Sequence, residues 1–252
     1  MARFKVGVQL RPQHTDITAL REAWQRADEL GVDSIFTWDH FYPLNGDPEG
    51  THFEGSSLLA AMAVTTTRAR FGMLVYCNSY RNPELLADMA RTVDLLSGGR
   101  YVLGVGAGWF ERDYTEYGYE FGTAPERLRA LGEALPRIKE RLGKLKPADP
   151  DLPILIGGGG EKVTLRLVAQ YADLWNTFGP VENFRHKNQV LNEWCAKLGR
   201  DPKAVERTVM IGDDEIDNYQ AYLDAGADHI ILGGNHPFEL DNVRRLLAHA
   251  QD

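Results

Sequence analysis

Short apolar segments typical of β-strands alternate with helical patterns along the whole chain. The predicted strands cover residues 4–10, 34–38, 71–76, 101–105, 154–156, 174–177, 208–211 and 229–232. The predicted helices cover residues 17–30, 57–67, 83–96, 125–142, 163–171, 184–198, 216–223 and 240–250. Strands that alternate with helices pair in parallel, and eight such units within 252 residues predict an α/β fold, the (β/α)8 TIM barrel. An open doubly wound sheet is the alternative, but it usually has fewer strands.

Nothing in the chain marks a boundary between two domains. Residues 144–152 contain two prolines, but they fit a loop between the fourth predicted helix and the fifth predicted strand. No other stretch has the composition of a linker or of a low-complexity segment. We therefore expect residues 1–252 to form a single barrel domain.

Charge and cysteine content argue against several classes of protein. A formal net charge of −8 disfavours a general nucleic-acid or membrane-surface binder. Cys77 and Cys195 are too few for a disulfide framework, which favours a reducing, cytoplasmic location. The chain enters its first predicted strand without a signal-peptide pattern, and no apolar run approaches the ~20 residues of a membrane helix. The histidines show no metal-ligand spacing, so we expect no metal site.

Four consecutive glycines mark the junction between a predicted strand and a predicted helix. They are Gly157, Gly158, Gly159 and Gly160. Backbone N–H groups without neighbouring side chains, next to the positive end of a helix dipole, predict a phosphate-binding loop. A flexible turn is the alternative. Lys162 and Arg166 stand four residues apart and would add positive charge beside this loop, unless they form an ordinary exposed helix face.

Candidate functional residues gather where the predicted strands end. In a (β/α)8 barrel the active site lies at the C-terminal ends of the strands. Those ends include Asp39-His40, Tyr76-Cys77-Asn78 and Gly106-Ala107-Gly108-Trp109. An imidazole exchanges protons near neutral pH, which makes His40 a candidate acid/base. The alternative is that His40 bonds a loop and Asp39 caps a turn. Trp109 and His14, the latter in a loop at the same end, are candidates for lining a substrate pocket.

Several motifs occur in a characteristic order along nearly the whole chain. They are Trp38-Asp39-His40-Phe41, Asn78-Ser79-Tyr80-Arg81-Asn82-Pro83, Leu95-Leu96-Ser97-Gly98-Gly99-Arg100, Leu103-Gly104-Val105-Gly106-Ala107-Gly108-Trp109 and Ile156-Gly157-Gly158-Gly159-Gly160-Glu161. In this order they resemble the bacterial luciferase-like flavin and deazaflavin oxidoreductases. The closest resemblance is to the branch that uses coenzyme F420, a deazaflavin. The motifs indicate family and fold more specifically than cofactor, and they indicate little about the substrate.

The resemblance implies a role for each of these strand ends. His40 would face the reactive edge of the cofactor, and Asp39 would contact the ring system. The third strand would end in a bulge, with a non-prolyl cis peptide within residues 74–76 that supports the ring. The implied cofactor-binding residues are Asp39, Val75, Tyr76, Cys77, Asn78, Gly106, Gly108, Gly157, Gly158, Gly159, Gly160 and Lys162, with Trp109 and His14 in the substrate pocket.

The chain departs from the family pattern in two places. The family usually carries a longer insertion between the fourth helix and the fifth strand, whereas this chain has only residues 143–153 there. We therefore expect a more open pocket. Some deazaflavin dehydrogenases of the family place a glutamate directly after the Gly-x-Gly of the fourth strand. This chain has Trp109 there, which argues against a sugar-phosphate dehydrogenase.

The resemblance implies an oxidoreductase that transfers hydride between C5 of coenzyme F420 and a small organic substrate. An FMN-dependent luciferase-like monooxygenase and a non-catalytic flavin- or deazaflavin-binding protein are the alternatives. A nicotinamide site is disfavoured, because no Gly-x-Gly-x-x-Gly motif is followed by a suitable acidic residue. The family usually dimerises through helices near the second and third strands, so a homodimer is expected.

Overall fold

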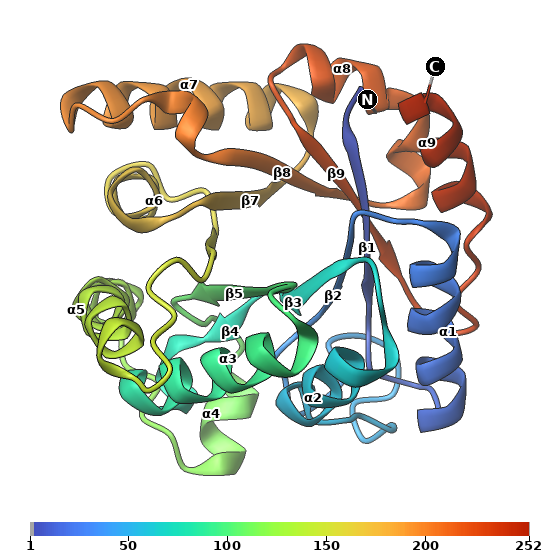
Figure 1. The fold of residues 1–252 in the computed structure, drawn as a ribbon, viewed down its shortest axis with the longest axis horizontal. Coiled ribbons are helices and arrows are strands. Elements are labelled where there is room, and N and C mark those ends of the chain that lie inside the picture. Colours follow the sequence, from blue (N-terminus) through green and yellow to red (C-terminus); the bar gives the residue numbers. More distant parts are fainter. Residues whose placement is uncertain (1–2, 252) are drawn as a thin grey trace.

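Parallel strands form one closed sheet in the computed structural model, which describes residues 3–251 (Figure 1). The strands are β1 (Lys5–Leu10), β2 (Ser34–Thr37), β3 (Arg70–Met73), β4 (Tyr76–Cys77), β5 (Tyr101–Gly106), β6 (Ile154–Gly157), β7 (Leu174–Phe178), β8 (Glu206–Ile211) and β9 (His229–Gly234). Their order in the sheet is β3-β2-β1-β9-β8-β7-β6-β5-β4, and a β3–β5 pairing closes the ring. The predicted (β/α)8 barrel is confirmed.

The third predicted strand is split into two parts. β3 ends at Met73, β4 begins at Tyr76, and the Leu74–Val75 peptide between them is cis. Both parts pair with β5, so together they occupy one position in the barrel. The cis peptide lies within the predicted range of residues 74–76.

Helices surround the barrel. They are α1 (Ile17–Leu30), α2 (Gly55–Thr65), α3 (Pro83–Ser97), α4 (Glu111–Tyr117), α5 (Ala124–Lys144), α6 (Thr164–Tyr171), α7 (Val181–Lys197), α8 (Tyr219–Asp224) and α9 (Asp241–Gln251). Short 3-10 turns lie at η1 (Asn78–Tyr80), η2 (Pro202–Ala204) and η3 (Asp213–Asn218). Local signals set many ends: Asn82 accepts two N–H groups at the start of α3, and Gly98 ends it with φ of 72°. None of the helices within residues 3–251 is long and apolar enough to cross a membrane.

The helix predictions were wrong in two places, and a third helix begins one residue later than predicted. The short helix α4 was missed. The helix predicted over residues 216–223 is the 3-10 turn η3 followed by the six-residue α8. The helix predicted from residue 163 begins at Thr164, after a turn that contains Lys162. Lys162 and Arg166 therefore do not share a helix face.

Two apolar layers hold the barrel together. Inside it, a cluster comprises Phe36, Leu74, Val102, Leu155, Leu174 and Ile231. Alternate strand residues point outward and pack against the helices, because both faces of a parallel sheet are covered. Each fully buried Val, Leu, Ile or Phe side chain contributes roughly 1.5–3 kcal/mol to folding.

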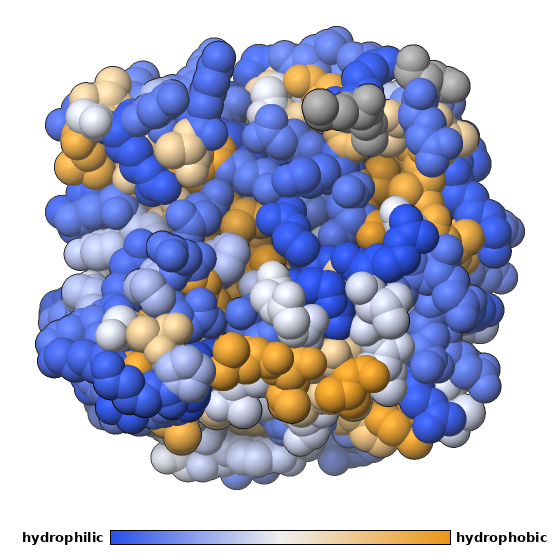
Figure 2. All heavy atoms as spheres, in the orientation of Figure 1, coloured by the Kyte–Doolittle hydropathy of each residue, from blue (hydrophilic) through white to orange (hydrophobic). Residues whose placement is uncertain are grey.

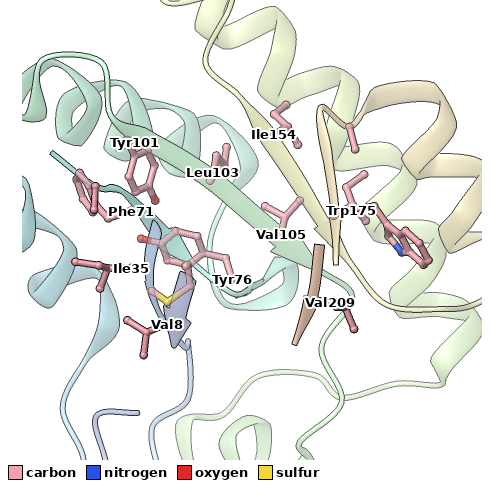
Figure 3. Packing of buried hydrophobic residues seen from close by; sticks show 14 of the residues in the cluster. Val8, Ile35, Phe71, Tyr76, Tyr101, Leu103, Val105, Ile154, Trp175 and Val209 are labelled. Carbon is pink, nitrogen blue, oxygen red and sulfur yellow. The ribbon is translucent and has the colours of Figure 1, made fainter. Parts of the chain in front are cut away.

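The face of the molecule in Figure 2 is mainly hydrophilic, with an apolar patch over α2 and α3. Figure 3 shows Val8, Ile35 and Phe71 side by side in the outer layer.

Two long excursions meet at the C-terminal ends of the strands. One is residues 38–54, after β2, and the other is residues 107–123, after β5, which contains α4 (Figure 1). The Phe41 N–H donates to Asp113 at 3.1 Å, and Arg112 donates to the Pro48 carbonyl at 2.7 Å. The connection from α5 to β6 is short, as predicted. Residues 38–54 and 107–123 supply the walls around the barrel mouth instead.

Candidate active site

A cavity of about 490 Å³ lies at the C-terminal ends of the barrel strands. This volume suits a ring-sized organic ligand. Its walls comprise Gln9, Arg11, Trp38, Asp39, His40, Leu44, Asn45, Leu74, Val75, Tyr76, Cys77, Tyr80, Gly106, Ala107, Gly108, Trp109, Gly157, Gly158, Thr164, Asn176, Phe178 and Met210. The predicted residues that line it are His40, Asp39, Val75, Tyr76, Cys77, Gly106, Gly108, Trp109, Gly157 and Gly158. Of the predicted residues, Asn78, Gly159, Gly160, Lys162 and His14 lie outside its walls.

His40 is held by a buried carboxylate that sequence reasoning missed. Asp113 on α4 is 0% exposed, and its Oδ2 lies 2.7 Å from His40 Nδ1. The same oxygen accepts the Tyr80 hydroxyl at 3.2 Å, while Oδ1 accepts the Phe41 N–H. A carboxylate acceptor assigns the ring proton to Nδ1. Nε2 is therefore the nitrogen left to exchange a proton with a molecule in the cavity.

Aromatic rings surround the His40 imidazole. Trp38, Trp109 and Phe110 meet it edge-on, with ring centroids at 5.5, 5.9 and 5.5 Å. Trp38 is fixed in turn, because its Nε1–H donates to His52 Nε2 at 3.0 Å. Burial and the neighbouring His40 lower the pKa of His52 to about 4, so His52 is neutral and can accept this bond at ordinary pH. Trp109 is 64% exposed and forms the outer wall.

Asp39 joins the end of β2 to the bulge after β3. Arg81 binds both of its oxygens, at 2.7 and 2.8 Å, and the Cys77 N–H donates to Oδ2 at 2.9 Å. Burial raises the pKa of Asp39, and the Arg81 guanidinium and the Cys77 N–H oppose that rise. With this bidentate partner the carboxylate stays ionised. Asp39, which was predicted to contact a cofactor ring, therefore bonds mainly to other groups of the protein.

The strand-end glycines make room for Val75. A Cβ added to Gly106 would lie 2.7 Å from a Val75 methyl group, and one added to Gly157 would lie 3.0 Å from the other. Gly108 has φ of 81°, and a Cβ there would lie 2.1 Å from the Tyr114 hydroxyl. We predicted that these glycines let the backbone approach a ligand. In the structure, Gly106 and Gly157 leave the space that Val75 occupies in the wall of the cavity, and Gly108 leaves space for the Tyr114 hydroxyl.

The four-glycine loop offers fewer free N–H groups than predicted. The Gly158 N–H donates to the Asn176 carbonyl at 2.9 Å. Among the described residues, no acceptor binds the N–H groups of Gly159 and Gly160. These two amides are therefore the ones available to an anion.

A second basic residue, Lys187, lies beside this loop. A Cβ on Gly159 would lie 3.6 Å from Lys187 Cε, and the Lys187 ammonium lies 2.5 Å from Glu161. Lys162 is exposed in the turn before α6, and Arg166 lines a separate outer groove. Lys187 comes from α7, so only the packing of α6 against α7 brings it to the loop. No local sequence signal could have found it.

His14 supports the cavity wall from behind. Its Nε2 lies 2.7 Å from the carbonyl oxygen of Asn45, which itself lines the cavity. Asn78 is 8% exposed at the start of η1, also outside the walls. Gln9 and Asn176, by contrast, line the cavity. Both end predicted strands, but neither was among the predicted site residues. Gln9 donates to the Leu74 carbonyl at 2.8 Å, and its buried Oε1 has no partner among the described residues.

Comparison with known proteins agrees with this geometry. A model of the family described as luciferase-like monooxygenase matches residues 1–249. The chain belongs to this family. The predicted membership is thus confirmed.

Individual relatives differ in their named activities. The chain is 34% identical over 138 residues to an F420-dependent glucose-6-phosphate dehydrogenase of Amycolatopsis mediterranei (strain U-32), covering 54% of this chain but only 41% of that protein. It is 27% identical over 239 residues to a pyrimidine monooxygenase of Caulobacter vibrioides (strain NA1000 / CB15N), covering 84% of this chain and 67% of that protein.

A solved structure shares the whole fold. It is an F420-dependent secondary alcohol dehydrogenase in complex with an F420–acetone adduct. The TM-score is 0.86 at 17% identity, with 99% of both chains covered. At this level of identity the likeness establishes the barrel fold, and not the activity.

Proposed function

We propose that this chain is a coenzyme F420-dependent oxidoreductase that transfers hydride between cofactor C5 and a small organic substrate. The observation that carries the proposal is the His40–Asp113 pair, which leaves one imidazole nitrogen for proton exchange at the wall of a ring-sized cavity. The family, and the relatives named as F420-dependent, support the choice of cofactor.

The residues present fit such a cofactor. Val75 and its neighbours Leu74 and Tyr76 give the cavity an apolar wall, and the glycines of β5 and β6 keep that wall free of further side chains. A planar ring matches this surface. The free amides of Gly159 and Gly160, with Lys187 nearby, match a phosphate. Asp39, Cys77 and Asn78 would act by holding the bulge in place.

The chain's own contribution is proton transfer, orientation and exclusion of water. When bound, the deazaflavin accepts or donates a hydride at C5. Oxidation of an alcohol releases one hydride and one proton, and His40 Nε2 takes the hydroxyl proton as the hydride leaves the carbon. Asp113 stabilises the imidazolium that results. In the reverse direction, His40 returns the proton to the carbonyl oxygen. Trp38 and Trp109 limit access of water.

The His40→Ala variant tests the acid/base assignment. Turnover with F420 should fall by about 10²–10⁴, the usual range for a lost general acid/base. F420 affinity should stay within about threefold, because the ring wall and the glycine loop remain intact. Steady-state kinetics and fluorescence titration measure the two effects. Wild-type turnover in a folded H40A protein would remove His40 from the mechanism.

An FMN-dependent monooxygenase is the second candidate, favoured by the relative named as a pyrimidine monooxygenase. An oxygen electrode separates the two. Turnover without oxygen uptake supports the deazaflavin oxidoreductase, and stoichiometric oxygen uptake with reduced FMN supports the monooxygenase. A non-catalytic binding protein is the third candidate, and it would have no use for an oriented imidazole in its cavity wall. Measurable turnover with either cofactor would rule this candidate out.

We also propose that the apolar patch over α2 and α3 forms a homodimer interface (Figure 2). The exposed apolar side chains of these two helices are Val64 at 64% exposure and Leu85, Leu95 and Leu96 at 53, 52 and 53%. Large exposed apolar patches commonly mark such interfaces. Light scattering should give the mass of a dimer for the wild type and of a monomer for Leu95→Glu. A monomeric wild type at micromolar concentration would contradict this proposal.

A further inference from the structure

Arg11 is the one arginine in the described part of the cavity wall, and its charge is not neutralised there. It follows β1 directly, and its backbone N–H donates to the Gly234 carbonyl at 3.1 Å. The other charged groups of the wall have close partners: Asp39 pairs with Arg81, and His40 with Asp113. Arg11 forms no such pair among residues 3–251, and its Nε is buried without a hydrogen-bond partner.

The surroundings of Arg11 hold it in place without satisfying it. Its guanidinium carbon lies 5.5 Å from the centre of the Trp38 ring. A Cβ on Gly233 would lie 2.6 Å from Arg11 Nη2, so the glycine at the end of β9 leaves space for the side chain. Asp213 is the carboxylate that acts on Arg11 from a distance, but its Oδ1 accepts the Asn242 amide at 2.8 Å. Burial lowers the pKa of Arg11, and Asp213 opposes this effect.

A half-buried guanidinium with free N–H donors is costly unless something binds it. Arginine presents its donors in a planar fork that matches a carboxylate or a phosphate. The Trp38 ring contacts both Arg11 and His40, so a small molecule anchored at Arg11 would extend along Trp38 toward the imidazole.

We propose that Arg11 binds an oxoanion group of the substrate, so that the enzyme selects small alcohols or carbonyl compounds that carry a carboxylate or a phosphate. This inference rests on the proposed function, because the bound anion is part of a substrate only if the chain is an enzyme. The anion site itself does not depend on which cofactor binds. Sequence analysis had not singled out Arg11, because no periodic pattern or motif includes it.

The first test needs no cofactor. Sodium acetate and sodium phosphate are titrated separately into cofactor-free protein at constant ionic strength, and tryptophan fluorescence reports on Trp38 beside Arg11. With acetate, a saturable change is expected with the wild type, a weaker one with Arg11→Lys and none with Arg11→Gln. With phosphate, Arg11→Gln should show a smaller change than the wild type, because the glycine loop can still bind phosphate. Arg166→Gln, which alters the outer groove between α5 and α6, is the matched control and should behave as wild type. Response to acetate alone, or to phosphate alone, identifies which oxoanion is bound.

The second test uses the enzyme with reduced F420 and a matched pair of ketones, acetone and pyruvate, which differ by a carboxylate in place of a methyl group. Arg11→Gln should lower kcat/KM for pyruvate by about tenfold or more, and leave that for acetone within about threefold. Equal losses for both ketones would overturn the proposal. So would the absence of any anion response in the wild type, or an unchanged response in Arg11→Gln. If the anions bind through Arg11 but F420 does not bind, the anion site stands and the proposed cofactor is wrong.

Discussion

At the scale of single residues, Asp113 determines what His40 can do. Its carboxylate is completely buried, and three groups donate to it: His40, Tyr80 and the Phe41 backbone. These bonds fix the ring of His40 and assign its proton to Nδ1. A neutral amide in the same position would keep the volume of the side chain but lose the negative charge.

We expect Asp113→Asn to slow turnover by roughly 10- to 1000-fold, because the imidazolium would lose its counter-charge and the ring its fixed tautomer. F420 affinity should stay within about threefold. Glu116→Gln, an exposed substitution on the same helix, is the control. Wild-type turnover in a folded Asp113→Asn protein would contradict this role.

His52 makes the stability of the fold depend on pH. Its pKa is lowered from 6.5 to about 4, mainly by burial, so the unfolded chain binds a proton before the folded protein does as the pH falls. As the pH falls from 6.5 to 4, this residue should therefore lower the free energy of unfolding by about 1.4 kcal/mol per pH unit. In His52→Gln, the amide oxygen can still accept the Trp38 N–H but does not titrate. Denaturant unfolding at several pH values should show a shallower slope for this variant, and identical slopes would refute the assignment.

At the scale of elements, the glycine loop depends on a helix that is distant in the sequence. Glu161 in the turn after the glycines contacts Lys187 and His186 of α7, and the Trp194 indole donates to the Glu161 carbonyl at 2.7 Å. These contacts hold the segment next to Gly159 and Gly160. The loop is thus shaped by α7 as well as by α6.

Gly159→Val should weaken F420 binding by about 1–3 kcal/mol, because a side chain there would crowd the Thr177 hydroxyl, 3.3 Å from an added Cβ, and block the backbone N–H. Gly143→Val is the matched control, since a Cβ at Gly143 meets no atom within 4 Å. Fluorescence titration compares the two variants, and thermal unfolding shows whether both are folded. If Gly159→Val binds F420 as tightly as Gly143→Val does, the phosphate lies elsewhere.

Elements with a local signal could be predicted from the sequence, and contacts between distant elements could not. The strand–helix units follow from periodic apolar residues and from caps such as Asn82 and Gly98. Helix α4 was missed because its seven residues, Glu111–Tyr117, include four charged ones and no apolar stripe. Asp113 matters only because α4 packs against His40 and Tyr80. The same holds for Lys187, whose place beside the loop depends on tertiary packing.

At the scale of the whole molecule, position in the barrel decides which polar cluster is functional. Ser34 Oγ lies 2.9 Å from His229 Nε2, and His229 Nδ1 lies 2.9 Å from Glu206 Oε1. This order of groups also occurs in serine hydrolases. Here it lies at the start of β2, β8 and β9, at the end of the barrel opposite the cavity. Ser34 and His229 are 1% and 0% exposed, so no substrate reaches them. The cluster joins strands, and the chemistry belongs to the cavity at the other end.

We propose that this cavity is built for a deazaflavin. The most direct measurement is a parallel titration of the cofactor-free protein with coenzyme F420 and with FMN, followed by tryptophan fluorescence, because Trp38 and Trp109 line the cavity. We predict a dissociation constant for F420 at least about tenfold below that for FMN, a difference of about 1.4 kcal/mol. Equal affinities, or a preference for FMN, would show that the cavity is not built for a deazaflavin.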